Sequence, residues 1–188
     1  MKGKRVVLVV DMLRGFHDMG NLANPRMAKI IPDVENLLNN ALAYGDYAIF
    51  LKDFHKSDDK EFKMFPPHCI RGTMETELVD ELKKFERYGL VINKTRYSGF
   101  YDTNLANVLN IYKPETVIVV GVCTDICVLH TVADLRNRDY SVIVPTDCVE
   151  TFDIPGHPAE ESAKWALNHM TKILGAVTVP LYKDLDQK

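Results

Sequence analysis

One stretch in the second half of the chain limits what the protein can fold into. Residues 116–122 read Thr-Val-Ile-Val-Val-Gly-Val, a mostly β-branched run without polar alternation. Such a run is typical of a strand buried on both faces, as in parallel sheets. The next segment has apolar residues at helical spacing, and it begins at Thr124, a residue type that caps helices. Cys127 is therefore predicted in the first turn of a helix, where the helix dipole favours a thiolate.

Strand and helix patterns alternate along the whole chain. Strands are predicted at residues 5–10, 47–51, 90–93, 116–122, 141–145 and 176–180. Helices are predicted at residues 27–44, 76–87, 102–112, 124–135 and 158–174, with Pro32 in the first turn of the regular part of the first one. This alternation favours a parallel sheet with helices on both faces. We predict one α/β domain over residues 1–188 with a six-stranded, mostly parallel sheet.

Composition excludes several classes of function. The 188 residues are 46% hydrophobic, which suffices for a core, and the net charge of -3 gives no reason to expect nucleic acid or an anionic membrane as a partner. No apolar run approaches the length of a membrane span, and the apolar run near the N-terminus is too short for a signal peptide. We expect a cytoplasmic protein whose four cysteines are free thiols.

Ionisable residues follow the predicted strands. Asp11, Lys94 and Cys127 come at or just after three strand ends, and parallel strands bring these ends to one edge of the sheet. A neutral thiol needs a base or a cation to react, so Lys94 would stabilise the thiolate and Asp11 would accept and return its proton. A Cys–His dyad with His130 is an alternative. The structural alternatives are a buried apolar Cys127, a capping Asp11 and a surface salt bridge at Lys94.

A second group of polar residues begins at the end of another strand. It consists of Asp53, His55, Glu61 and His68, spread over the long irregular segment 53–73. Long irregular segments in compact domains are usually functional. Two imidazoles and two carboxylates suit Zn²⁺, Fe²⁺ or Mn²⁺ better than Ca²⁺. Asp58 or Asp59 could replace Glu61 as a ligand, and a solvated polar loop is the structural alternative.

These residues carry a family resemblance. The chain resembles the nicotinamidases (pyrazinamidases) of the isochorismatase-like cysteine hydrolase family, which have a three-layer α/β/α fold. The matching segments are VVDMLRGF (9–16), DFH (53–55), FPPHCIRGT (65–73), KTRYSGF (94–100) and GVCTDIC (121–127), in the family's order. The combination of Asp-x-His with Pro-Pro-His separates nicotinamidases from metal-free relatives such as isochorismatases.

The resemblance implies a role for each residue. Asp11, Lys94 and Cys127 would be the catalytic triad. The backbone N–H groups of Cys123 and Cys127 would form an oxyanion hole, next to a cis peptide between Val122 and Cys123. Phe16, Tyr97 and Phe65 would bind the substrate ring, although many members have tryptophan in place of Phe65. The metal ligands would be Asp53, His55, His68 and, in the glutamate type of the family, Glu61. Zinc is the first choice of metal, with iron or manganese as alternatives.

The implied activity is hydrolysis of nicotinamide to nicotinate and ammonia, a step of NAD salvage, through a cysteine thioester. The metal would hold the pyridine nitrogen. The partner would be a small molecule, and because relatives often self-associate we expect a homo-oligomer. Three alternatives remain open: a metal-free member of the family, a related cysteine amidase for another small amide such as pyrazinamide, and a non-enzymatic α/β scaffold.

Overall fold

A parallel sheet forms the centre of the molecule. The computed structural model describes residues 4–180. The strands are β1 (Arg5–Val10), β2 (Tyr47–Asp53), β3 (Gly89–Lys94), β4 (Thr116–Val122), β5 (Val142–Pro145), β6 (Val149–Glu150) and β7 (Val177–Val179). Their order is β3-β2-β1-β4-β5-β7, with β6 beside β4, and every pairing is parallel. The predicted parallel sheet is confirmed. The six predicted strands form the continuous order of the sheet, and the two-residue β6, which is too short to leave a pattern in the sequence, adds a short seventh strand beside β4.

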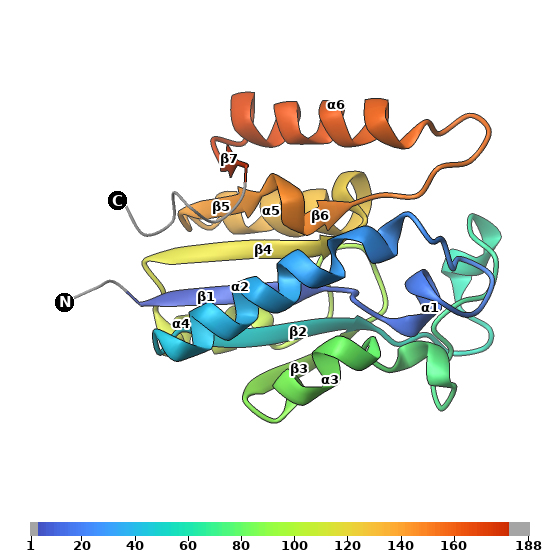
Figure 1. Cartoon of the computed structure of the whole chain (residues 1–188), viewed down its shortest axis with the longest axis horizontal. Coiled ribbons are helices and arrows are strands. Elements are labelled where there is room, and N and C mark those ends of the chain that lie inside the picture. Colours follow the sequence, from blue (N-terminus) through green and yellow to red (C-terminus); the bar gives the residue numbers. More distant parts are fainter. Residues whose placement is uncertain (1–3, 181–188) are drawn as a thin grey trace.

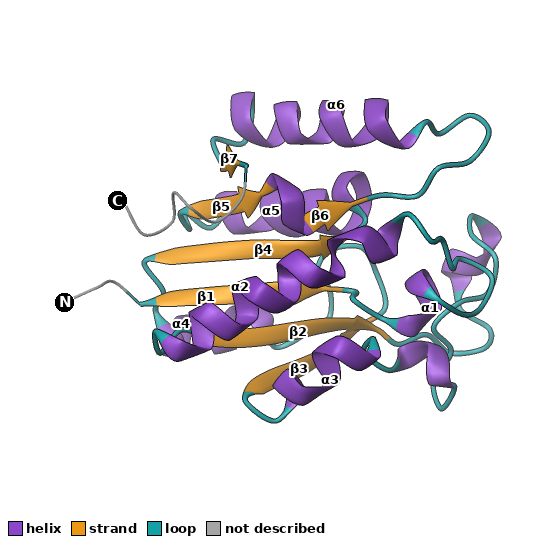
Figure 2. Ribbon diagram, in the orientation of Figure 1, coloured by secondary structure: helices purple, strands orange, loops and turns teal. Residues whose placement is uncertain are grey.

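Helices cover both faces of the sheet (Figures 1 and 2). They are α1 (Arg14–His17), α2 (Ile31–Ala43), α3 (Asp80–Glu86), α4 (Leu105–Tyr112), α5 (Leu129–Arg136) and α6 (Ala159–Lys172). In Figure 1, α2 and α3 lie in front of the sheet and α4 and α5 lie behind it. The layers are therefore α/β/α, as predicted. Pro32 occupies the first turn of α2, because proline lacks only an N–H that the helix does not use there.

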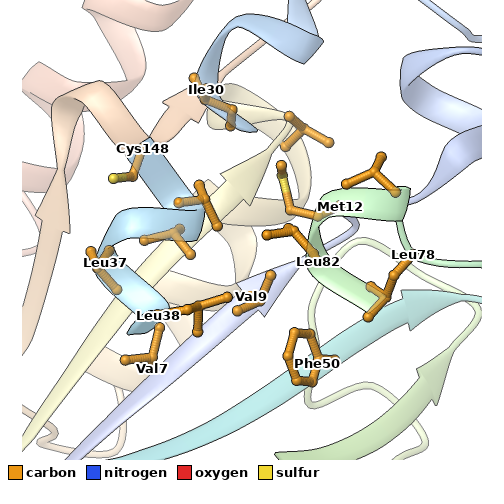
Figure 3. Packing of buried hydrophobic residues seen from close by; sticks show 14 of the residues in the cluster. Val7, Val9, Met12, Ile30, Leu37, Leu38, Phe50, Leu78, Leu82 and Cys148 are labelled. Carbon is orange, nitrogen blue, oxygen red and sulfur yellow. The ribbon is translucent and has the colours of Figure 1, made fainter. Parts of the chain in front are cut away.

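Alternate residues of the strands feed two separate cores. Val7 and Val9 of β1 join the cluster under α2 and α3, whereas Val6, Leu8 and Val10 join the cluster under α4, α5 and α6. Figure 3 shows the first cluster, in which residues of β1, β2, α2 and α3 meet. Both faces of the central strands are thus buried, and this explains their unbroken apolar sequence.

One predicted helix is shorter in the structure than its sequence pattern indicates. The predicted helix at 76–87 begins only at Asp80, because Leu78 forms an antiparallel bridge with Leu13 and the Val79 N–H donates to the Met12 carbonyl. Trp165 lies on the outer side of α6, with an exposed fraction of 59%. Among the described residues, no helix has the length and apolarity needed to cross a membrane.

The order of the strands reverses between β1 and β4, which lie side by side at the middle of the sheet. Gly121 makes this close approach possible, because its φ is +115° and a Cβ there would overlap the Val10 backbone. Ligand sites of such sheets lie at the carboxyl ends of the strands at this reversal. The segments that follow β1 and β4 carry Asp11 and Cys127.

Candidate active site

Asp11 follows β1 directly and is held by backbone contacts. Its φ of +50° is unusual for a residue other than glycine, and aspartate is among the types that tolerate it. Its N–H donates to the Leu51 carbonyl over 3.0 Å, and its Oδ1 accepts the Asp53 N–H over 2.9 Å. The carboxyl group is therefore fixed between β1 and β2, and Asp11 is only 1% exposed.

Lys94, at the end of β3, connects the ionisable groups. Its Nζ lies 2.6 Å from Asp11 Oδ2, 2.6 Å from Asp53 Oδ1 and 3.5 Å from Cys127 Sγ. The lysine side chain is 0% exposed. A carboxylate oxygen of Asp11 lies within 4.8 Å of the Cys127 sulfur. The structure thus brings together the thiol, the acid and the amine, which the sequence spreads over residues 11 to 127.

Burial and nearby charges shift the pKa values of the two carboxyl groups around Lys94 in opposite directions. Burial, together with the Asp53 charge, raises the pKa of Asp11 to about 7 although Lys94 lowers it. Burial alone would also raise the pKa of Asp53, but Lys94 and the histidines His55 and His68 hold it well below its usual range. Asp53 therefore stays ionised at neutral pH, whereas Asp11 can exchange a proton.

Cys127 lies in a π-helical turn, Thr124–Val128, that precedes α5. Burial raises the pKa of this thiol well above its usual range, and the nearby Lys94 offsets this only in part. Desolvation thus opposes the thiolate form that the start of the helix is expected to favour. The peptide between Val122 and Cys123 is cis.

The second group of polar residues also converges. Asp53, His55, Glu61 and His68 are buried, and each offers a ligand atom within 4.8 Å of the others. Asp53 Oδ2 is 3.6 Å from His55 Nε2 and 3.7 Å from His68 Nε2. His68 Nε2 is 3.8 Å from Glu61 Oε1.

These separations fit a shared cation better than direct hydrogen bonds. They exceed the usual hydrogen-bond length of about 3 Å, whereas ligands ~2.1 Å from a tetrahedral zinc ion lie roughly 3.4 Å apart. His55 Nε2 and Glu61 Oε2 are buried and have no hydrogen-bond partner among residues 4–180. Burial raises the pKa of Glu61 and the Asp53 charge raises it further, so the cluster favours added positive charge. The donor set fits a divalent metal of the zinc, iron or manganese type.

A cavity of about 380 Å³ lies against both groups. Phe16, Phe65 and Tyr97 line it, together with Cys123, Cys127, Asp53, Glu61 and His68. Leu22, Met27, Ile126, Phe152 and Ile154 complete its apolar walls. The sequence does not predict this last set. Leu22, Phe152 and Ile154 come from irregular segments without periodicity, whereas Met27 and Ile126 lie in predicted helices, where they look like ordinary apolar positions.

The alternative partners named from the sequence lie elsewhere. His130 is exposed, its Nδ1 is 2.7 Å from the Ile126 carbonyl oxygen, and its ring packs on Tyr97. Asp58 is exposed, and Asp59 contacts the other side of the His55 ring, through Nδ1. Neither carboxylate belongs to the converging ligand set, whereas Glu61 does.

A further network joins the Cys127 turn to the cavity wall. Asp125 accepts hydrogen bonds from Thr151 Oγ1 over 2.6 Å and from His157 Nε2 over 2.7 Å. The His157 ring stacks on Phe152 with centroids 4.2 Å apart. These contacts hold the irregular segment 151–158, with its cavity-lining side chains, against the turn. The sequence does not predict this network, because His157 lies in the irregular segment 155–158, Pro-Gly-His-Pro, which has no periodicity.

The fold and the site define a class of protein: hydrolases of the isochorismatase-like type, with a three-layer α/β/α fold. The isochorismatase domain family matches residues 5–179, and the chain belongs to this family. Its members are hydrolases and include amidases.

Individual relatives are similar over nearly the whole chain. Nicotinamidase 1 of Arabidopsis thaliana is 30% identical over 94% of this chain and 81% of its own length. The crystal structure of pyrazinamidase/nicotinamidase from Streptococcus mutans UA159 has a TM-score of 0.85 and 31% identity, covering 94% of this chain and 100% of that one. N-carbamoylsarcosine amidase from Thermoplasma acidophilum has a TM-score of 0.82 and 30% identity over 94% of this chain and 96% of that one.

Proposed function

We propose that the protein is a nicotinamidase, which hydrolyses nicotinamide to nicotinate and ammonia in NAD salvage. The observation that carries the proposal is that one apolar cavity meets both a thiol with an acid and an amine behind it and a cluster of metal-binding type. The first group supplies the nucleophile, the base and the cation that a cysteine amide hydrolase uses. The nitrogen of a pyridine ring that carries the amide would be a ligand for a metal held by the second group.

The proposed ligands are Asp53, His55, Glu61 and His68. A divalent metal held there supplies a Lewis acid for the nitrogen of the substrate ring. The aromatic side chains of Phe16, Phe65 and Tyr97 contact the faces and edge of that ring. The substrate carboxamide is then oriented toward Cys127, and the apolar walls exclude bulk water.

The proposed acylation begins with proton transfer from the Cys127 thiol to Asp11. Lys94 stabilises the thiolate through its charge, 3.5 Å from the sulfur. The thiolate forms a bond to the amide carbon, and the carbonyl oxygen becomes an oxyanion that accepts from the backbone N–H groups of Cys123 and Cys127. Asp11 then donates its proton to the departing nitrogen, the C–N bond breaks, and ammonia leaves a thioester on Cys127.

The proposed deacylation uses the same residues in reverse. Asp11 takes a proton from a water molecule while the oxygen of that water forms a bond to the thioester carbon. The C–S bond breaks, Asp11 returns the proton to the sulfur, and the carboxylic acid is released. The balance is one amide and one water to one acid and one ammonia. A pKa of about 7 lets Asp11 serve as base and acid in turn.

The test is ammonia release from nicotinamide by wild type and Cys127→Ala, each with and without a chelator. We expect wild-type turnover, loss of turnover in Cys127→Ala with nicotinamide binding retained, and weaker substrate capture after chelation. Turnover by Cys127→Ala would refute the thioester route. Full activity of rigorously metal-free protein would refute the metal's role.

A second candidate is a related cysteine amidase for another small amide. The similarity to N-carbamoylsarcosine amidase favours it, because that enzyme matches over 94% of this chain. A panel containing nicotinamide, pyrazinamide, benzamide and N-carbamoylsarcosine separates the candidates. Benzamide is the sharpest control, because it keeps the ring and the amide but lacks the ring nitrogen. Equal kcat/KM for benzamide and nicotinamide would count against the nicotinamidase proposal.

A further inference from the structure

Asp59 contacts two members of the candidate metal cluster without belonging to it. Its Oδ2 lies 3.1 Å from His55 Nδ1, and its Oδ1 accepts the Glu61 N–H over 3.0 Å. Its Oδ1 also accepts from Arg96 Nη1 over 2.8 Å. The Asp59 side chain is only 9% exposed although the neighbouring loop residues face solvent. Both carboxylate oxygens are therefore engaged within the protein.

The contact with His55 determines which ring nitrogen can bind a metal. An ionised carboxylate can only accept a hydrogen bond, so the proton of a neutral His55 ring lies on Nδ1. The lone pair is then on Nε2, which is buried and lies 3.6 Å from Asp53 Oδ2, with no hydrogen-bond partner in the part of the chain that the structure describes. A carboxylate behind a ligating imidazole fixes the orientation of the ring and raises its basicity.

The contact with Glu61 fixes the backbone that carries the fourth candidate ligand. Asp59 immediately precedes a short 3-10 helix, Lys60–Lys63, and accepts the Glu61 N–H as its N-cap. Glu61 is 3% exposed in a segment whose other charged residues are largely exposed. The cap therefore holds the first turn in the orientation that directs the Glu61 carboxylate inward.

Arg96 attaches this loop to the strand that carries Lys94. It lies two residues beyond Lys94, and besides its contact with Asp59 its Nη1 is 4.0 Å from Glu61 Oε2. Its charge offsets the repulsion between two carboxylates that come close together on the loop. The guanidinium group is planar and rigid, so its hydrogen bond to Asp59 holds the loop in place relative to β3.

We propose that Asp59 and Arg96 are positioning residues that set the metal affinity of the cluster. Asp59 orients His55 and Glu61 for binding, and Arg96 holds Asp59 in place. The inference rests on the proposed function in one respect, that the cluster binds a divalent metal; it does not depend on which amide the enzyme hydrolyses.

The experiment measures metal binding without substrate. Wild type, Asp59→Ala, Asp59→Asn and Arg96→Gln are freed of metal and titrated with Zn²⁺ in competition with a chromophoric chelator. Co²⁺ is titrated in parallel, because its visible absorption spectrum reports ligand geometry. Asp58→Asn is the matched control: it removes the same charge from the adjacent, exposed position. Circular dichroism verifies the fold of each variant.

We expect Asp59→Ala to weaken Zn²⁺ binding by about 10–100-fold and to change the Co²⁺ spectrum. Asp59→Asn should lose less, because an amide oxygen in the place of Oδ1 still accepts from the Glu61 N–H and from Arg96. Arg96→Gln should also lose less. Asp58→Asn should match wild type. Wild-type affinity in both Asp59→Ala and Arg96→Gln would overturn the inference, as would an equal loss in Asp58→Asn. Should Asp59→Ala not fold, Asp59→Asn and Arg96→Gln decide in the same way. No Zn²⁺ binding by wild type would instead overturn the metal site of the proposed function.

Discussion

Replacement of Lys94 by methionine is the sharpest test of the buried charge arrangement. Methionine has a similar length but no charge, so Lys94→Met leaves Asp11 and Asp53 facing each other in a fully buried site. The wild-type ammonium lies 2.6 Å from each carboxylate, and its side chain is 0% exposed. The variant therefore removes two ion pairs without opening a large cavity.

The expected loss follows from the burial. Removing one partner of a buried ion pair costs about 3–5 kcal/mol, because the other charge remains without compensation. Domains of ordinary stability have a free energy of unfolding of about 5–15 kcal/mol. Lys94→Met is therefore expected to be severely destabilised but still able to fold. In contrast, Lys52 and Glu86 pair over 3.3 Å at a partly exposed site. Lys52→Met should cost at most about 1 kcal/mol and serves as the control.

The loss should depend on pH with a definite sign. In wild type the pKa of Asp53 is held well below its usual range, so its stabilisation is present above the unfolded pKa of about 3.9 and is lost only in acid. In Lys94→Met the folded state raises the carboxyl pKa values, so stability falls as pH rises through them. The difference between wild type and Lys94→Met should therefore be larger at about pH 8 than at about pH 5.5.

Unfolding by guanidinium chloride measures these differences in the free energy of unfolding. A chelator is present throughout, so that no bound metal adds its charge to the site. The double variant Lys94→Met/Asp11→Asn should recover part of the loss, because it removes one of the two facing carboxylates. A loss in Lys94→Met no larger than that in Lys52→Met would refute the reasoning. A loss that does not vary with pH would refute the assignment of the cost to uncompensated carboxylates.

Three further outcomes are expected. Gly121→Ala should destabilise the fold by on the order of 3 kcal/mol, because a Cβ would overlap the Val10 backbone at a φ of +115°; an unfolding midpoint equal to that of wild type would contradict this. His157→Gln should remove a pH-dependent contribution: burial lowers the pKa of His157, but the hydrogen bond and the charge of Asp125 raise it by more. That stabilisation is complete below the unfolded pKa of about 6.5 and is lost as pH rises through the higher folded pKa, so a stability difference from wild type that stays constant between about pH 6 and pH 9 would argue against it. Phe65→Ala should raise KM for nicotinamide by roughly tenfold with a smaller change in kcat, because the ring lines the cavity; steady-state ammonia release tests this, and a loss confined to kcat would count against a binding role.

Much of the fold and part of the site follow from patterns that short segments carry. The apolar runs of β1 and β4 indicate strands buried on both faces, and the alternation with helices indicates a parallel sheet. Parallel strands share a carboxyl edge, so Asp11, Lys94 and Cys127 were expected together before any contact was known. Pro32 marked the first turn of α2.

The remaining features depend on segments without periodicity. Nothing local distinguishes Asp59 from Asp58, yet one binds His55 and Arg96 while the other faces solvent. The apolar pattern of α6 likewise gave no sign that Trp165 lies on its outer side. The two residues of β6 pair with Gly121 and Val122 at the end of β4, beyond the part of β4 that pairs with β5.

The sequence by itself determined the layers, the parallel direction of the strands and the chemical types of the groups at their ends, because these follow from side-chain periodicity and residue identity. Only the tertiary structure decided the separations and the protonation. Desolvation and charge act through space, so the pKa of Asp11 near 7 and the raised pKa of Cys127 arise from neighbours far away in the chain. The same holds for the ring orientation of His55, which depends on a carboxylate in the loop and an arginine beyond β3.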